Sequence, residues 1–160
     1  FFGFLKWKDY DAELFDKVKY EADLNIVPSA VKIWGSDISE KAVVQARANA
    51  SMAGLKEVIS LEVADFCNLK ATGDNGFIFF NPPYGERLLQ NETDNLYNMI
   101  GSTLKHSFPG TTAWLITSNK ESLKQVGLKP AKKYTLFNGA LECILLKYEM
   151  YSGTKKIVQL

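Results

Sequence analysis

The sequence predicts an α/β protein with a mostly parallel sheet that ends in an antiparallel hairpin. Short apolar segments alternate with stretches of helical periodicity, which is typical of strands joined by crossover helices. Near the end, Asn138-Gly139 lies between the strand-like segments 133–137 and 141–148, where it favours a tight hairpin. The chain has 160 residues, 46% of them hydrophobic, so one domain with a real core is expected.

The first half of the chain is expected to form a helix, a strand, a helix and a strand. Residues 11–22 carry apolar side chains at helical spacing, and residues 31–37 form a strand after a proline. Ser39 is a suitable N-cap for a second helix, and Gly54 a suitable residue just after its end. Residues 59–64 form the next strand. The expected buried faces are Leu14, Phe15, Val18 and Ala22 in the first helix, and Ala42, Val43, Ala46 and Ala50 in the second.

The second half continues this alternation. Residues 77–80 are apolar throughout, which predicts a strand in the centre of the sheet. A helix over residues 93–107 and a strand over residues 113–117 follow. Ser118 and Glu121 have the spacing of a capping box, so a short helix is expected to begin there.

Charge and cysteine usage narrow the class of protein. The net charge of +1 does not mark a nucleic-acid binder, but residues 120–160 hold eight lysines against three glutamates. Such a basic surface either contacts phosphates or is simply solvated. Cys67 and Cys143 fit no metal-ligand spacing and are expected to be reduced core thiols of a cytoplasmic protein. Because the cysteine spacing fits no metal site, no bound metal is expected. No apolar stretch is long enough to span a membrane, so no membrane partner is expected either.

The four residues Asn81-Pro82-Pro83-Tyr84 say most about function, because they follow an apolar strand that leads to the sheet edge. They suit methyl transfer to an amino nitrogen whose lone pair is delocalised into a flat ring. The Asn81 side-chain oxygen and the Pro82 carbonyl can accept hydrogen bonds from such an amino group. The prolines stiffen the loop, and Tyr84 can stack on a flipped base. The competing interpretation is a stiff turn with a core tyrosine.

Two acidic positions precede this motif at the ends of predicted strands. Ligands bind outside the carboxyl ends of strands in open α/β sheets, and an acidic residue there commonly accepts hydrogen bonds from ribose hydroxyls. Asp37 has this position, although it can also simply cap the following helix. Asp65 can accept from an adenine amino group while Phe66 packs on the ring. We therefore expect Asp37, Asp65 and Asn81 to converge on one cleft.

With these residues in view, the chain resembles the class I S-adenosylmethionine-dependent methyltransferases. More narrowly, it is similar to the THUMP-associated RNA methyltransferases that modify guanine N2 in large-subunit ribosomal RNA. The resemblance extends over nearly the whole chain. The matching stretches are Phe4-x-x-Trp7-Lys8, Gly35-Ser36-Asp37-Ile38, Ala46-x-x-Asn49, Ala64-Asp65-Phe66, Asn81-Pro82-Pro83-Tyr84-Gly85-Glu86-Arg87-Leu88 and Asn138-Gly139-x-x-Glu142-Cys143.

The resemblance implies a Rossmann-like class I methyltransferase sheet, S-adenosylmethionine as cofactor, and RNA as substrate. Asp37 would hold the ribose and Asp65 the adenine, while the Asn81 loop would hold the target base. The implied site residues are Asp37, Ile38, Asp65, Phe66 and Asn81 for the cofactor, Asn81, Pro82 and Tyr84 for catalysis, and Pro83, Tyr84 and Arg87 for the substrate.

One part of the family pattern is missing. Such enzymes carry a glycine-rich loop after their first strand, but this sequence contains no Gly-x-Gly and does not begin with Met. We therefore expect residues 1–160 to be the C-terminal portion of a single catalytic domain. Its first strand and an RNA-binding THUMP module would precede Phe1. Because that strand lies in the middle of the family's sheet, its absence would leave a gap in hydrogen bonding and weak cofactor binding.

Other functions stay open on the sequence alone. An adenine-N6 DNA methyltransferase or a glutamine-N5 protein methyltransferase would need the same loop for the same reason. A catalytically silent module used for docking is a further alternative, against which the intact Asn81, Pro82 and Tyr84 argue. Arg87 either contacts a phosphate or pairs with Glu86.

Overall fold

The alternation of helices and strands is confirmed by the computed structural model, which describes residues 2–28, 30–73, 75–83 and 89–151. Short 3-10 helices (η) occur between the longer elements. The elements in chain order are η1 (Gly3–Lys6), α1 (Ala12–Leu24), β1 (Ile33–Asp37), α2 (Glu40–Met52), β2 (Ile59–Val63), η2 (Phe66–Asn68), β3 (Phe77–Phe80), α3 (Gln90–Ser107), β4 (Thr112–Thr117), η3 (Ser122–Val126), β5 (Lys132–Asn138) and β6 (Leu141–Glu149).

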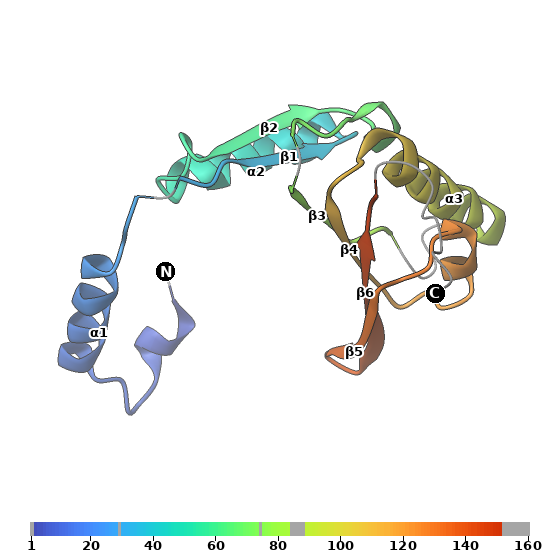
Figure 1. The fold of residues 1–160 in the computed structure, drawn as a ribbon. Helices are drawn as coiled ribbons and strands as arrows, with labels where there is room; N and C mark the ends of the chain where they lie inside the picture. Colours follow the sequence, from blue (N-terminus) through green and yellow to red (C-terminus); the bar gives the residue numbers. More distant parts are fainter. Residues whose placement is uncertain (1, 29, 74, 84–88, 152–160) are drawn as a thin grey trace, which may run out of the picture.

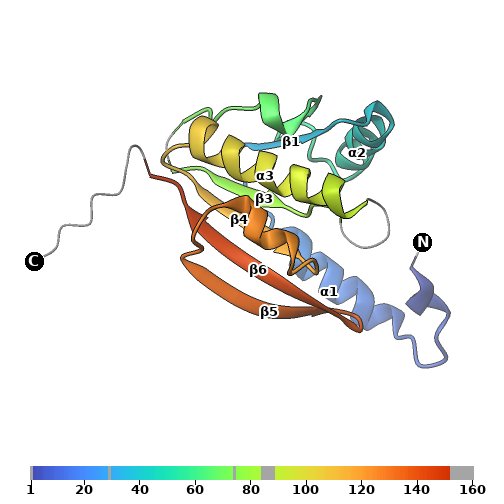
Figure 2. The same ribbon diagram turned by 90° about the vertical axis from the view of Figure 1, so that its right-hand side faces the viewer.

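The strands form two sheets (Figure 1). β1 and β2 pair in parallel, and the second sheet has the order β3-β4-β6-β5. In the second sheet β3 and β4 are parallel, whereas β6 is antiparallel to both β4 and β5. α3 lies along one face of this larger sheet, as Figure 2 shows. The predicted parallel strands followed by an antiparallel hairpin are thus confirmed.

The prediction that residues 77–80 form a central strand is wrong for the described part of the chain. β3 lies at the edge of its sheet, with β4 on one side only. Phe77 and Phe79 are 69% and 73% exposed, although their apolar character is that of a strand covered on both faces. β1 likewise pairs with β2 alone among the described strands. Among the described strands, β1 and β3 therefore each have one edge without a pairing partner.

The predicted helix ends are confirmed where capping side chains define them. The Asp11 carboxylate accepts a hydrogen bond from the Leu14 backbone amide at the start of α1. The Ser39 hydroxyl accepts one from the Ala42 amide at the start of α2. Gly54 follows α2 with φ of +71°, a left-handed conformation that glycine adopts without strain. Local chemistry thus determines these boundaries.

The predicted burial of the first helix is wrong. Leu14 and Val18 on its apolar face are more than half exposed, and α1 lies apart from both sheets in Figure 1. Phe15 instead joins a small aromatic cluster with Phe4 and Tyr10. In α2 only Val43 of the expected face is fully buried, and Ala42 is exposed. The sequence periodicity identified the apolar faces of α1 and α2, but few described residues pack against these faces.

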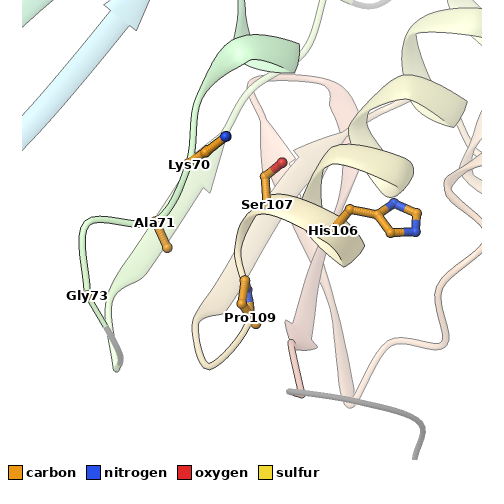
Figure 3. A pocket seen from close by; sticks show the side chains of 6 residues that line it. All are labelled: Lys70, Ala71, Gly73, His106, Ser107 and Pro109. Atoms are coloured by element: carbon orange, nitrogen blue, oxygen red, sulfur yellow. The ribbon is translucent and has the colours of Figure 1, made fainter.

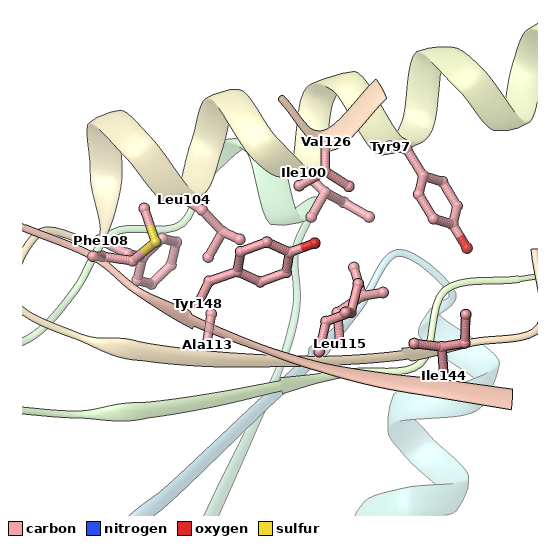
Figure 4. Close-up of a cluster of buried hydrophobic side chains, with 11 residues drawn as sticks. Tyr97, Ile100, Leu104, Phe108, Ala113, Leu115, Val126, Ile144 and Tyr148 are labelled. Atoms are coloured by element: carbon pink, nitrogen blue, oxygen red, sulfur yellow. The ribbon is translucent and has the colours of Figure 1, made fainter. Parts of the chain in front are cut away.

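The main core lies between α3 and the larger sheet (Figure 4). Leu96, Ile100 and Leu104 have the spacing expected for burial, and Ile100 and Leu104 are fully buried against β4 and β6. Alternate residues of β4 and β6 point into the same layer, as the period of a strand requires. The core residues are Tyr97, Ile100, Leu104, Phe108, Ala113, Leu115, Val126, Ile144, Leu146, Tyr148 and Met150.

Two local predictions need correction. The hairpin turn is Gly139-Ala140 rather than Asn138-Gly139, because Asn138 pairs with Leu141 and Gly139 takes the positive φ of +62°. The helix expected to start at Ser118 is the 3-10 helix η3, which begins only at Ser122. Its first amide is capped by a different side chain, as described below.

Candidate active site

The carboxyl ends of β1 and β2 place two predicted cofactor residues at one sheet edge. The strands are in parallel register, with Asp37 opposite Val63. The Ala64 amide donates to the Asp37 carbonyl at 3.1 Å, which extends the pairing to the last residue before Asp65. Asp37 and Asp65 therefore end neighbouring strands, as the sequence predicts. Both side chains are exposed, and Ile38 beside Asp37 is exposed as well.

Each carboxylate is oriented by a turn that leads into the next helix. Asp37 Oδ1 accepts from the Ser39 amide at 2.8 Å, and Asp65 Oδ1 accepts from the Cys67 amide at 3.0 Å. The helix-capping interpretation of Asp37 is therefore correct in part, since one oxygen does hold the start of α2. Using one oxygen in this way limits rotation of the carboxyl group.

The chemistry around Asp65 favours its charged form. Hydrogen bonds from the Cys67 backbone amide and then its thiol lower the pKa of Asp65, against a smaller opposing effect of burial. The hydrogen bond to Asp65 raises the pKa of the Cys67 thiol, and burial and the negative charge of Asp65 raise it further. Cys67 is exposed and Cys143 is buried, so the expectation of two core thiols is wrong for Cys67. Asp65 is thus an ionised acceptor at neutral pH.

Phe66 connects this edge to the larger sheet. Its ring meets that of Phe80 edge to face at 4.8 Å between centroids, and it stacks on Phe108 at 5.5 Å. The Ala71 amide also donates to the Ser107 carbonyl at 2.9 Å, which holds the segment after η2 against the end of α3. Asp65 precedes Phe66 and Asn81 follows Phe80, so each of these two predicted residues adjoins one of the two rings in contact. Sequence periodicity gave no sign of this contact.

The first residues of the predicted acceptor loop follow β3 directly. Pro82 is buried, whereas Asn81 and Pro83 are exposed. A buried proline between two exposed residues holds the backbone in place while leaving the Asn81 amide accessible. Tyr84 and Arg87, for which stacking and phosphate contact are predicted, lie outside the described residues, as do Gly85, Glu86 and Leu88.

The basic C-terminal part is partly neutralised. Lys120 pairs with Glu142 at 2.7 Å, and Lys147 pairs with Glu149 at 2.8 Å. Residues 120–160 contain three glutamates, and two of them form these pairs. The excess positive charge is therefore carried by the other lysines, some of them beyond residue 151.

One hollow of about 360 Å³ lies elsewhere (Figure 3). It is lined by residues that precede β3 or precede β4, so it opens at the amino ends of these strands. Ligands of open α/β sheets bind at the opposite end. His106 lies there and its Nδ1 is 2.8 Å from the Ser102 carbonyl within α3, so a catalytic role is not indicated. The lining residues are Lys70, Ala71, Gly73, His106, Ser107 and Pro109.

The described segments hold neither a candidate metal group nor a membrane-spanning helix. No three His, Cys, Asp or Glu side chains among residues 2–28, 30–73, 75–83 and 89–151 gather in a group that could hold a metal ion. Across the same segments, no helix is long and apolar enough to cross a membrane.

The order of these elements and the acidic strand ends define an α/β methyltransferase fold. The structure is similar to that of SMU.472, a putative methyltransferase complexed with SAH, with a TM-score of 0.80 and 31% identity over 96% of this chain and 41% of that one. It is also similar to a possible methylase from Clostridium difficile 630, with a TM-score of 0.79 and 33% identity over 94% of this chain and 40% of that one.

The chain belongs to the family UPF0020, the RMKL-like methyltransferase domain, which matches residues 3–147. Among curated relatives, the ribosomal RNA large subunit methyltransferase K/L of Shewanella baltica is 34% identical over 97% of this chain. That of Shewanella oneidensis is 35% identical over the same share. The chain spans only 23% and 22% of the length of these two relatives.

Proposed function

We propose that this chain is the C-terminal part of the catalytic domain of an S-adenosylmethionine-dependent RNA methyltransferase. The expected product is a base methylated on an exocyclic amino group, guanine N2 of large-subunit ribosomal RNA. The contact between Phe66 and Phe80 carries the proposal, because Asp65 and Asn81 are the chain neighbours of these two residues. The names of the curated relatives support RNA as the substrate class.

The residues at the β1 and β2 ends fit the cofactor. Its ribose hydroxyls and adenine amino group are hydrogen-bond donors, and Asp37 and Asp65 are exposed acceptors on neighbouring strands. Each is held by a backbone amide through Oδ1, so the carboxylates are oriented before a ligand arrives. Ile38 and the half-buried Phe66 supply apolar surface beside them. This donor and acceptor match supports cofactor roles for Asp37, Ile38, Asp65 and Phe66.

The Asn81 loop supplies the catalytic groups in this proposal. S-adenosylmethionine supplies an electrophilic methyl group, so the protein needs mainly to orient the acceptor nitrogen. The Asn81 side-chain oxygen and the Pro82 carbonyl accept hydrogen bonds from the target amino group, which gains positive charge as the new bond forms. The buried Pro82 limits backbone movement at this point. Tyr84 and Pro83 are proposed to contact the base, and Arg87 a phosphate.

The site is completed by a longer protein. β1 and β3 each have one paired edge among the described strands, and the side chains beside the free edges include exposed aromatics, Trp34 on β1 and Phe79 on β3. A further strand between them would pair both edges. We propose that this strand and an RNA-binding module lie in the part of the longer protein that precedes the chain. The 160 residues alone are expected to bind S-adenosylmethionine poorly, and micromolar binding in calorimetry would contradict this.

An adenine-N6 DNA methyltransferase is the second candidate. A predicted N6-adenine-specific DNA methylase from Listeria monocytogenes has a TM-score of 0.74 and is 26% identical over 90% of this chain and 37% of that one. An adenine amino group would use the same two acceptors as guanine N2. A silent docking module would keep the fold but transfer no methyl group.

In the decisive experiment, the full-length protein is incubated with labelled S-adenosylmethionine. Ribosomal RNA, duplex DNA and protein are offered as substrates in separate reactions. Label in RNA supports the proposal, and label in DNA supports the second candidate. Label in none of the three would support the docking module. Asn81→Ala should abolish most turnover, whereas Asn95→Ala, at an exposed position of α3, should not.

A further inference from the structure

The first turns of α3 are attached to the segment after β4 by polar side chains. The Tyr97 hydroxyl and Thr117 Oγ1 are 2.5 Å apart, and both residues are completely buried. Thr117 Oγ1 also accepts from the Asn119 backbone amide at 3.0 Å. In Figure 4, Tyr97 lies at one end of the apolar core. The core thus ends in a hydroxyl pair at the carboxyl end of β4.

A second polar contact lies one turn earlier in α3. Ser122 Oγ donates to Asp94 Oδ1 at 2.6 Å, and Gln90 Nε2 lies 3.0 Å from each of these two atoms. Ser122 is completely buried, and its amide donates to Asn119 Oδ1 at 2.9 Å. The latter bond holds the first amide of η3, near the position where the sequence predicts a capping box. The residues of these two contacts are called the α3 anchor, and they are Gln90, Asp94, Tyr97, Thr117, Asn119 and Ser122.

The contacts of the α3 anchor differ in kind from those that hold the rest of α3. Ile100 and Leu104 pack against apolar residues of the sheet, and such contacts are not directional. Burying polar groups is costly unless all are bonded, and no buried side-chain nitrogen or oxygen in the described residues lacks a partner. A satisfied polar contact therefore adds directional bonds that fix the depth and rotation of the helix start.

Both ends of the connection from β3 to α3 are held against the same strand. Phe80, the last residue of β3, pairs with Leu115 of β4, and Asn81 follows it. The anchor ties the other end, the start of α3, to the residues that follow β4. Within that end, Thr93 Oγ1 donates to the Leu89 carbonyl at 3.1 Å. The described residues at the two ends of this connection, Asn81 and Leu89, are thus both placed relative to β4.

We propose that the α3 anchor positions the acceptor groups of Asn81 and Pro82 for methyl transfer. Asp94, Tyr97, Thr117 and Ser122 act by fixing the start of α3 relative to the end of β4, so they are positioning residues. This inference rests on the proposed function. A displacement of about 1 Å can cost roughly 100-fold in rate when it misaligns reacting groups, so a moderate loosening of the anchor is expected to be visible in kcat.

The test uses the full-length protein with labelled S-adenosylmethionine and ribosomal RNA. Ser122→Ala and Asp94→Ala are each expected to lower kcat about tenfold or more, while KM for S-adenosylmethionine changes less than about twofold. Asp94→Asn keeps an acceptor oxygen for Ser122 and Gln90 and is expected to retain most of kcat.

Ile100→Val is the matched control, because it shortens a fully buried side chain of the same helix away from the connection. It should lower the thermal midpoint and leave kcat near that of the wild type. The inference is overturned if Ser122→Ala and Asp94→Ala behave like this control. It is also overturned if Asp94→Asn is as slow as Asp94→Ala.

A second measurement separates this inference from the proposed function. In Ser122→Ala the amides of Thr93 and Tyr97 are expected to exchange hydrogen faster, while that of Leu104 keeps its protection. Unchanged exchange at Thr93 and Tyr97 would overturn the anchor, whatever the activity. A wild-type protein that is inactive on every RNA would refute the proposed function, and the exchange result would still decide whether the anchor holds the helix start.

Discussion

Gly101→Ala is expected to destabilise the protein because α3 and η3 meet backbone to backbone at this position. A Cβ atom on Gly101 would stand 1.8 Å from the Val126 carbonyl oxygen and 2.7 Å from its carbonyl carbon. Ordinary contact begins at 3.4 Å, so the two segments would have to separate by about 1.6 Å. The obstacle is backbone, which cannot change rotamer as the end of a side chain can.

The magnitude follows from two opposing effects. Overpacking of this kind costs about 1–3 kcal/mol, and a displacement of the backbone lies toward the upper end of that range. Alanine recovers about 1 kcal/mol of helix propensity relative to glycine. We therefore expect a net loss of about 2 kcal/mol in the free energy of unfolding. Val126 is buried in the main core, so the separation would also loosen apolar contacts there.

Urea unfolding followed by tryptophan fluorescence measures this effect, since Trp114 lies in β4 next to the affected core. Ser102→Ala is the matched control, because it changes the next and exposed residue of the same helix and should alter stability by only a few tenths of a kcal/mol. A Gly101→Ala variant as stable as the wild type would show that α3 and η3 do not approach each other so closely.

Three further predictions concern the site and its chemistry. In the full-length protein, Asp37→Ala should weaken S-adenosylmethionine binding at least about tenfold, as expected for loss of a charged hydrogen bond. The control Asp23→Ala, on the exposed α1, should not weaken it. If calorimetry gives Asp37→Ala the same affinity as the wild type, Asp37 does not bind the ribose. Asp65→Asn should speed alkylation of Cys67 several-fold near neutral pH, because Asp65 holds the pKa of that thiol above its usual value, and an unchanged rate in mass spectrometry would contradict this. Burial, with a smaller effect of Tyr97, raises the pKa of Tyr148 to about 12 from 10.0, so the folded state keeps this proton longer than the unfolded state. The stabilising effect is complete below pH 10 and is lost as pH rises toward 12, by about 1–2 kcal/mol, and Tyr148→Phe should lack this part of the pH dependence in chemical unfolding.

The sequence predicted local features well because they depend on local chemistry. Ser39 caps its helix through its own side chain, as predicted, and Gly54 takes the left-handed conformation that its position requires. The alternation of apolar segments with helical patterns predicted the order of the helices and strands along the chain. The acidic residues at the ends of β1 and β2 were found for the same reason, since parallel strands bring their carboxyl ends to one edge.

Predictions failed where a residue's surroundings come from distant parts of the chain. The apolar run of β3 predicts a covered strand, but Phe77 and Phe79 are exposed because no described segment lies against them. Leu14 and Val18 have helical spacing and still find no sheet to cover. Ser118 and Glu121 fit a capping box by spacing alone, yet it is the Asn119 side chain that accepts from the first amide of η3.

By itself, the sequence determined the elements, their order, the family resemblance and the individual candidate residues, because each depends on a few neighbouring side chains. Only the tertiary structure decided which of them meet. The Phe66 ring reaches Phe80 across 14 positions in the chain, and Asp94 reaches Ser122 across 28. No period or motif encodes such contacts, since they arise when whole strands and helices pack and the buried rings and polar groups must each find a partner.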